Sequence, residues 1–236
     1  MQASTGKRQY LRGLYRFGRV VVRAVTRTRA VQHPEYLEDG VVYISRHMDM
    51  HGPIRTMAYL PVQAHVWALS VFVDYKECFE QFSTYTFPSR YRWWPAWFTK
   101  ALSDCLAWPL TRLMRDMEVV PVYRSQRDIL KTMNKSMEYL LQGESLIIFP
   151  DIAYSSESAE VGDLYMGYLH LGRSYYRKTG KPLKFVPMYA PYHDAVLDVG
   201  EPLFLDPEKS YNEEKERVTA AIQNFFLDAA RRDGDL

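Results

Sequence analysis

Short apolar runs alternate with helical patterns along most of this chain, and this alternation limits the possible folds more than any other feature. The clearest run, residues 145–149, is the continuous apolar stretch expected of a strand buried on both faces of a sheet. Further strands are predicted at residues 41–45, 62–73, 119–123, 184–189 and 195–199. Helices are predicted at residues 53–60, 125–142, 164–178 and 211–232, with residues 74–118 irregular to helical. The sequence therefore predicts an α/β domain whose mixed, largely parallel sheet is flanked by helices.

Length and composition indicate one large domain preceded by a separate helix. The 236 residues are enough to bury a core, and 47% hydrophobic with 25% charged residues excludes a disordered or collagen-like chain. Because no repeat or linker is found, we expect a basic amphipathic helix in residues 1–35 and the α/β domain in residues 36–236. The longest stretch without Asp, Glu, Lys or Arg, residues 56–73, contains Pro61 and is interpreted as a helix end and a buried strand.

Basic residues are concentrated at the N-terminal end of the chain. Residues 1–30 contain eight Lys and Arg and no Asp or Glu, although the net charge of the whole chain is only +2. Within residues 7–30, one face of a helix carries arginines at three- and four-residue spacings, namely Arg8, Arg12, Arg16, Arg19, Arg23 and Arg27. Apolar residues follow the same rhythm on another face: Tyr10, Leu14, Phe17, Val21 and Ala24. This pattern is typical of a helix lying in a membrane interface.

Two other interpretations of this helix remain open. It can pack its apolar face on the domain and leave its arginines in water, or it can bind the phosphates of a nucleic acid. We expect no nucleic-acid partner, because no zinc, helix-turn-helix or RNA-recognition pattern accompanies the basic residues. Two cysteines, Cys78 and Cys105, are too few for a disulfide scaffold and fit a reducing compartment. We therefore expect a peripheral protein on the cytoplasmic face of a membrane.

A second segment, residues 88–115, also has the composition of a membrane interface. It contains four of the five tryptophans of the chain, interleaved with Arg90, Arg92, Lys100, Arg112 and Arg115. Indole rings favour the boundary between hydrocarbon and headgroups, and basic side chains can reach lipid phosphates. We expect Trp93, Trp94 and Trp97 to contact the membrane. For Trp108, a place in the core beside Leu106, Leu110 and Leu113 is the alternative.

The candidate active site lies in the loops that follow the predicted strands, because the carboxyl ends of parallel strands meet at one edge of a sheet. His47 follows the first strand, and an imidazole can take a proton from a hydroxyl near neutral pH. Asp49 can orient that ring, as a carboxylate does in a catalytic triad. Arg124 and Arg127 follow another strand and supply fixed positive charge for a phosphate or carboxylate. Together these groups suit acyl transfer to the hydroxyl of a phosphorylated alcohol.

The order of these motifs resembles the lysophospholipid or glycerolipid acyltransferase superfamily, whose type member acylates 1-acylglycerol-3-phosphate. The family's Asn-His-x4-Asp block is similar to residues 46–53, where Arg46 precedes His47. The later family blocks are similar to residues 119–124, ending in Arg124, to Phe149-Pro150-Asp151, and to Val186-Pro187-Met188. The resemblance implies direct acyl transfer from acyl-CoA or acyl carrier protein to a lysophospholipid or glycerol phosphate, with no resident cofactor and no metal.

The chain departs from the family pattern at two blocks. Gly52 occupies the place of the family's aspartate, so the resemblance leaves Asp49 as its replacement. In the third block Asp151 replaces glutamate, and Ile152-Ala153-Tyr154 replaces Gly-Thr-Arg. The resemblance therefore assigns substrate binding to Arg124, Arg46, Arg127 and Asp151.

Two other functions fit the same residues. A metal-dependent hydrolase could use His47, Asp49 and His51, three ligand types within five residues, with further ligands from His170 or His193 and Asp151. A non-catalytic relative could keep the acyltransferase fold and bind lipid without turnover, which the departures at Gly52 and Tyr154 favour.

Overall fold

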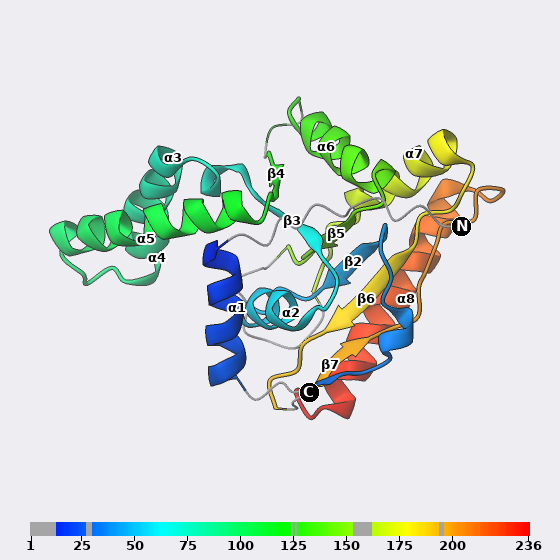
Figure 1. Cartoon of the computed structure of the whole chain (residues 1–236), viewed down its shortest axis with the longest axis horizontal. Helices are drawn as coiled ribbons and strands as arrows, with labels where there is room; N and C mark the ends of the chain where they lie inside the picture. Colours follow the sequence, from blue (N-terminus) through cyan, green and yellow to red (C-terminus); the bar gives the residue numbers. More distant parts are fainter. Residues whose placement is uncertain (1–12, 27–29, 124, 126, 153–161, 194–195) are drawn as a thin grey trace.

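A single mixed sheet lies at the centre of the computed structural model, which describes residues 13–26, 30–123, 125, 127–152, 162–193 and 196–236 (Figure 1). Within these residues seven strands follow the order β1-β7-β6-β2-β5-β3-β4. Strands β6, β2, β5, β3 and β4 are parallel, whereas β7 is antiparallel to β6 and parallel to β1. Their bounds are β1 Ala30–Val31, β2 Val42–Ser45, β3 Ala64–Leu69, β4 Val120–Val122, β5 Ser145–Ile148, β6 Phe185–Tyr189 and β7 Val196–Val199. The predicted fold class is confirmed.

Helices flank this sheet on both faces. They are α1 Gly13–Val25, α2 His51–Tyr59, α3 Tyr75–Glu80, α4 Phe87–Arg90, α5 Ala96–Asp116, α6 Ile129–Leu141, α7 His170–Thr179 and α8 Tyr211–Arg232. Figure 1 shows α3, α4 and α5 standing together beside the sheet, on the side where α1 and α2 lie. Within the described parts of the chain, no helix is long and apolar enough to span a bilayer.

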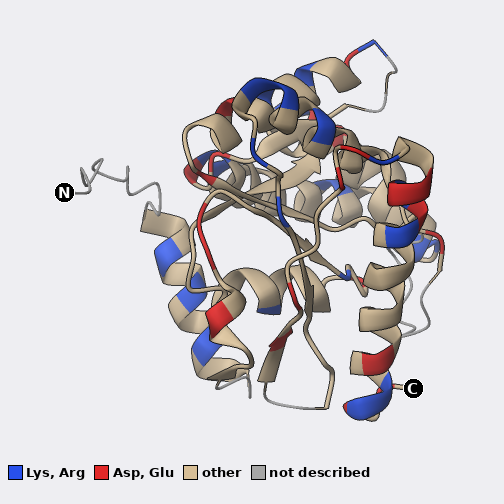
Figure 2. Ribbon diagram, turned by 90° about the vertical axis from the view of Figure 1, so that its right-hand side faces the viewer, with Lys and Arg blue, Asp and Glu red and all other residues tan. Residues whose placement is uncertain are grey.

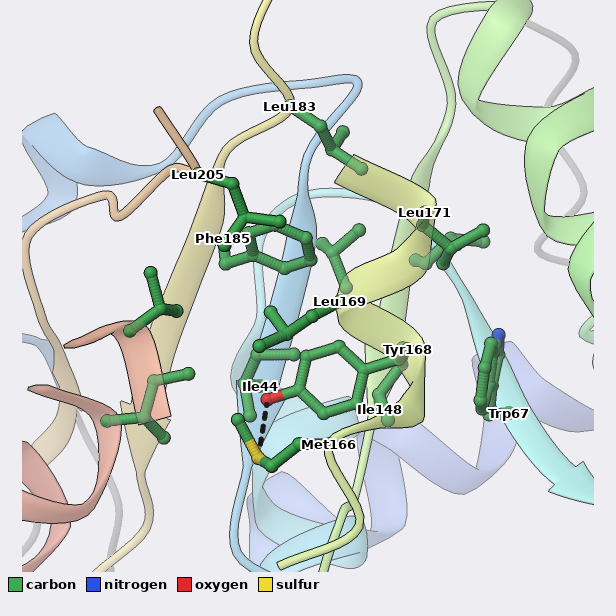
Figure 3. Packing of buried hydrophobic residues seen from close by; sticks show 14 of the residues in the cluster. Ile44, Trp67, Ile148, Met166, Tyr168, Leu169, Leu171, Leu183, Phe185 and Leu205 are labelled. Atoms are coloured by element: carbon green, nitrogen blue, oxygen red, sulfur yellow. Dashed lines mark hydrogen bonds between the residues drawn. The ribbon is translucent and has the colours of Figure 1, made fainter. Parts of the chain in front are cut away.

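Neighbouring residues of the central strands pack into two separate hydrophobic cores, one on each face of the sheet. Val42 and Ile44 of β2 belong to the core under α6, α7 and α8, whereas Val41 and Tyr43 belong to the core on the opposite face. Figure 3 shows the first core, where Ile44 and Ile148 lie close to Tyr168, whose hydroxyl faces the sulfur of Met166. Because successive side chains of a strand point to opposite faces, a strand covered on both faces must be apolar throughout.

Two helices begin later than the sequence predicts. The helix predicted at residues 125–142 is α6, which starts at Ile129, because Ser125 forms a preceding turn whose carbonyl accepts from the N–H of Asp128. The helix predicted at residues 164–178 is α7, which starts at His170. Leu164 instead forms a β-bridge with Asp151. Residue 30 is also not helical, because Ala30 pairs with Val196 at the edge of the sheet.

Candidate functional site

The loop after β2 turns sharply at the carboxyl edge of the sheet. Met48 and Asp49 both have positive φ, 43° and 55°, which is uncommon for residues with a side chain. The N–H of Gly52 donates to the carbonyl of His47 at 3.1 Å, so α2 begins almost directly after the strand. This loop therefore holds its side chains within one tight turn.

Asp151, which follows β5, fixes the start of this loop. Its carboxylate accepts from Nε of Arg46 at 2.5 Å and from the backbone N–H of His47 at 2.6 Å. The pair is buried, since the side chain of Arg46 is 4% exposed and that of Asp151 7%. The Arg46 guanidinium also lies 5.8 Å from the ring centroid of Phe226 in α8. Both residues are predicted to bind substrate. In the structure they bind each other, and their contact with substrate stays a prediction.

His47 lies where strands β2 and β5 end side by side. Its ring meets Phe149 edge to face, with centroids 5.8 Å apart and an interplanar angle of 79°. The residue is partly exposed, while its Nδ1 atom is shielded from solvent. A reacting hydroxyl would therefore have to approach the other ring nitrogen, Nε2.

Asp49, predicted to orient the His47 ring, forms an ion pair with Arg90 at the end of α4. Nη1 of Arg90 lies 3.3 Å from Oδ1, and Nη2 lies 3.4 Å from Oδ2. The side chains are 28% and 48% exposed, so water screens the pair. This ion pair was not predictable from the sequence, because 41 residues separate Arg90 from Asp49. The one sequence feature that pointed to Arg90 was the basic and aromatic segment in which it lies.

His51 is bound to the loop after β6. Its Nε2 lies 3.0 Å from the carbonyl oxygen of Pro191, and its ring lies on Tyr192 with centroids 4.1 Å apart. Burial lowers the pKa of His51 below its ordinary value, and the nearby charge of Arg55 lowers it further. At neutral pH the ring is therefore neutral and packed against its neighbours.

The ligand set proposed for a metal-dependent hydrolase is not assembled. Across the residues that the structure describes, which include His47, Asp49 and His51, no three His, Cys, Asp or Glu side chains are grouped to hold a metal ion. Asp49 faces Arg90, and His51 faces a backbone carbonyl. The prediction of this ligand set is wrong, because the turn directs its alternate side chains to different neighbours.

The predicted phosphate-binding arginines come after β4 in the sequence. Arg124 lies outside the described residues, whereas Arg127 is described and exposed. Strands β5 and β3 separate β4 from β2, which puts the two strand ends about 14 Å apart at the usual strand spacing. A hollow of about 210 Å³ lies elsewhere, between α7 and the start of α8, and no predicted site residue lines it.

Gly52 stands where the acyltransferase block that residues 46–53 resemble has an aspartate, and its surroundings leave no room for a side chain. A Cβ atom there would lie 1.9 Å from the carbonyl oxygen of Arg46 and 2.9 Å from that of His47. Contacts this short require the backbone of the loop to move. An aspartate at this position is therefore incompatible with the observed path of the chain.

Helix α1 is attached to the domain by its polar face. Nε of Arg19 and Nε of Arg23 donate to the carbonyl of Ala58 at 3.1 and 2.8 Å, and Nη2 of Arg19 donates to that of Leu60 at 3.0 Å. These carbonyls end α2 and lack helical partners, so the arginines cap it. Figure 2 shows the basic residues along α1. The predicted stripe of arginines is thus used at least partly within the protein.

The apolar face of α1 points away from the domain. Phe17 is 65% exposed, Val20 66% and Val25 76%, and no described residue of this helix is buried. The interpretation in which α1 packs its apolar face on the domain is therefore wrong. The reason is that the carbonyls at the end of α2 bind the arginines and turn the opposite face outward.

Comparison with known proteins supports the fold. No family model and no curated protein matches the sequence of this chain. Among solved structures, the fold is similar to the crystal structure of the 1-acyl-sn-glycerophosphate (LPA) acyltransferase PlsC from Thermotoga maritima. The TM-score is 0.55, covering 92% of this chain and 78% of that chain, and the sequences are 12% identical. At this identity the likeness shows a shared fold and leaves the reaction to be inferred from the site.

Proposed function

We propose that this protein is a membrane-associated acyltransferase that moves a fatty acyl group from a thioester to the hydroxyl of a lysophospholipid or glycerol phosphate. One observation carries the proposal: His47 stands at the carboxyl end of the central strand β2 in a sheet with the fold of an LPA acyltransferase, and Asp151 fixes its backbone. Sites in such sheets form at this edge.

In the proposed reaction His47 acts as the general base. Nε2 takes the proton of the acceptor hydroxyl, and the oxygen attacks the carbonyl carbon of the thioester. The tetrahedral intermediate expels the thiolate, which receives the proton from the imidazolium, so atoms and charges balance. Arg124 and Arg127 are proposed to bind the acceptor phosphate, and acyl-CoA or acyl carrier protein supplies the acyl group. The role of Asp151 is to hold the loop, through Arg46 and the backbone of His47.

The membrane contact is proposed to be the outward face of α1. Phe17, Val20, Val21 and Val25 form an exposed apolar surface on a helix whose polar side is already bound to α2. Burying such side chains in the headgroup boundary stabilises an interfacial helix. A lipid acceptor would then reach the site from the membrane to which the protein is attached.

A second candidate function is lipid binding without turnover. The observation that favours it is Gly52, because the backbone there excludes the family's aspartate and Asp49 pairs with Arg90 instead. A protein whose loop lacks that aspartate could keep the fold and the acceptor site while losing the chemistry.

Release of free thiol from acyl-CoA, measured with a panel of lysophospholipids, separates the two candidates. If His47 is the base, His47→Ala lowers turnover by about 10²- to 10⁴-fold. His33→Ala is the matched control, because His33 directly precedes the 3-10 helix Pro34–Tyr36, where its ring contacts the exposed Glu35 and the ring of Tyr36. Equal background rates for the wild type and His47→Ala would favour the non-catalytic function.

A further inference from the structure

Helices α3, α4 and α5 form an arm between β3 and β4, and this arm has an aromatic interior. Ring centroids lie 5.5 Å apart for Phe82 and Phe87, 6.1 Å for Phe87 and Trp94, and 4.1 Å for Trp94 and Tyr91. A π-helical segment, Gln81–Thr86, joins α3 to α4. The rings thus connect the two sides of the arm, which Figure 1 shows beside the sheet.

The inner face of α5 is lined by small residues. Thr99, Ser103, Ala107 and Thr111 recur every four residues and are all buried. The hydroxyls of Ser103 and Thr111 donate to carbonyls of their own helix, at 2.6 and 2.9 Å, so they need no water. Small residues at a helix contact let the backbones approach closely, which is how helices pack where lipid rather than water surrounds them.

Two tryptophans of α5 point outward instead. Trp97 is 72% exposed and Trp108 67%, and their separation of eleven positions places both on one side of the helix, about 16 Å apart along its axis. Trp93, just before the helix, is 80% exposed, and Leu106 is 39% exposed. The core position considered for Trp108 is therefore wrong. We call Trp93, Trp97 and Trp108 the arm face.

Basic residues predominate in the segment of sequence that carries the arm face. Residues 90–115 contain Arg90, Arg92, Lys100, Arg112 and Arg115 against a single acidic residue, Asp104. Arg92 and Lys100 are exposed, and neither has an ion-pair partner among the residues that the structure describes. A symmetric contact with a second copy would bring these like charges together, whereas an anionic lipid surface would neutralise them.

The geometry points to the arm face as a second lipid-binding surface, in which the indole rings enter the interfacial region of an anionic phospholipid bilayer. This surface extends the membrane contact proposed for α1, and the inference rests on that proposal for which side of the protein faces the bilayer. The two elements adjoin, because the N–H of Leu14 in α1 donates to the carboxylate of Asp116 at the end of α5. Two lipid-binding surfaces on adjoining helices would fix the orientation of the protein on the bilayer as well as its attachment.

The tryptophans of the chain report this contact directly. Four of the five are in the arm, whereas Trp67 is buried and donates to Oγ of Ser136 at 2.9 Å. With the full chain and vesicles of phosphatidylcholine mixed with phosphatidylglycerol, emission should shift to the blue and be quenched by brominated lipid. Trp97→Ser with Trp108→Ser should lower binding to these vesicles at least about tenfold. Leu130→Ser with Phe204→Ser is the matched control, because these side chains are 64% and 47% exposed and lie outside the arm.

Several outcomes decide the inference. Undiminished vesicle binding by the double tryptophan variant would overturn it, and so would a blue shift that depends on protein concentration without lipid, which would indicate a second copy. Acyl transfer by a wild-type protein that binds no vesicles would overturn this inference together with the membrane contact proposed for α1, and would leave the proposed reaction standing. Vesicle binding through the arm by a wild-type protein that transfers no acyl group would support it and refute the proposed enzyme activity.

Discussion

Asp151 and Arg46 form a buried ion pair although 105 residues separate them, and the same carboxylate accepts the backbone N–H of His47. Neighbouring parallel strands, β2 and β5, bring these residues together at their carboxyl ends. The position of the His47 backbone therefore depends on Asp151, which belongs to the segment after β5.

Loss of the carboxylate charge at position 151 should destabilise the fold. In Asp151→Asn the buried guanidinium of Arg46, 4% exposed, loses the carboxylate charge of Asp151, and breaking a buried pair in this way costs about 3–5 kcal/mol. Urea denaturation measures the change in the free energy of unfolding. Glu138→Gln is the control: its pair with Lys135 is 53% and 38% exposed, so its loss should cost less than about 1 kcal/mol. Equal losses in the two variants would contradict the role given to Asp151.

A methyl group at position 52 should be poorly tolerated. Gly52→Ala puts a Cβ atom 1.9 Å from the carbonyl oxygen of Arg46, and we expect the free energy of unfolding to fall by at least about 2 kcal/mol. Gly18→Ala in α1 is the matched control, since no heavy atom lies within 4 Å and alanine favours a helix by up to about 1 kcal/mol. Thermal and urea unfolding check both variants. A neutral Gly52→Ala would show that the loop relaxes easily.

The outward face of α1 should govern attachment to lipid. Phe17, 65% exposed, contributes apolar area that only a membrane would cover, so Phe17→Ser should weaken vesicle binding about tenfold. Co-sedimentation with vesicles measures this, and the folded state should keep its melting temperature because the side chain is exposed. If Phe17→Ser and the wild type bind vesicles equally, α1 is not the attachment.

Acid should destabilise the protein through His51. Burial, aided by Arg55, lowers the pKa of His51 below 6.5 in the folded state, although the Pro191 carbonyl and Asp235 act in the opposite direction. The unfolded chain therefore takes up the proton first as the pH falls. The stability that the neutral ring provides is present above about pH 6.5 and is lost as the pH falls through the folded pKa.

Melting temperatures recorded from about pH 7.5 down to about pH 5 test this dependence. His51→Asn should reduce the fall. Part of the fall should remain, because burial, together with Lys215 and Arg173, also lowers the pKa of His170. An unchanged pH profile in His51→Asn would exclude His51 as a source of the acid sensitivity.

The strands were predictable because a strand that is buried on both faces has a continuous run of apolar residues in its own sequence. Residues 146–149 and 185–189 are apolar throughout, and the structure forms β5 and β6 there with every strand residue buried. The position of His47 at a strand end follows from the same pattern. The partner of Asp151 did not, because a buried pair between residues 105 apart depends on which strands are neighbours.

Orientation was the property that the sequence could not supply. The rhythm of α1 shows two faces, but which one meets the domain depends on the carbonyls of Ala58 and Leu60, and every residue has a carbonyl. The same holds for α5, where Trp108 points outward because Thr99, Ser103, Ala107 and Thr111 allow a close helix contact. Large apolar residues are expected inside a domain, so the sequence alone allowed the large apolar side chains of both helices to be placed in the core.

The crowding around Gly52 has a consequence for the alignment of sequences that share this fold. Compared with the acyltransferase block that it resembles, the loop has a glycine in place of an aspartate. The atoms around Gly52 nevertheless show that an aspartate there would require a different path of the backbone between β2 and α2. Reinstating the missing acid would therefore take at least two coordinated changes, one in the side chain and one in the loop that now occupies its space. A column-by-column comparison treats these changes as independent, whereas in the folded molecule they are inseparable.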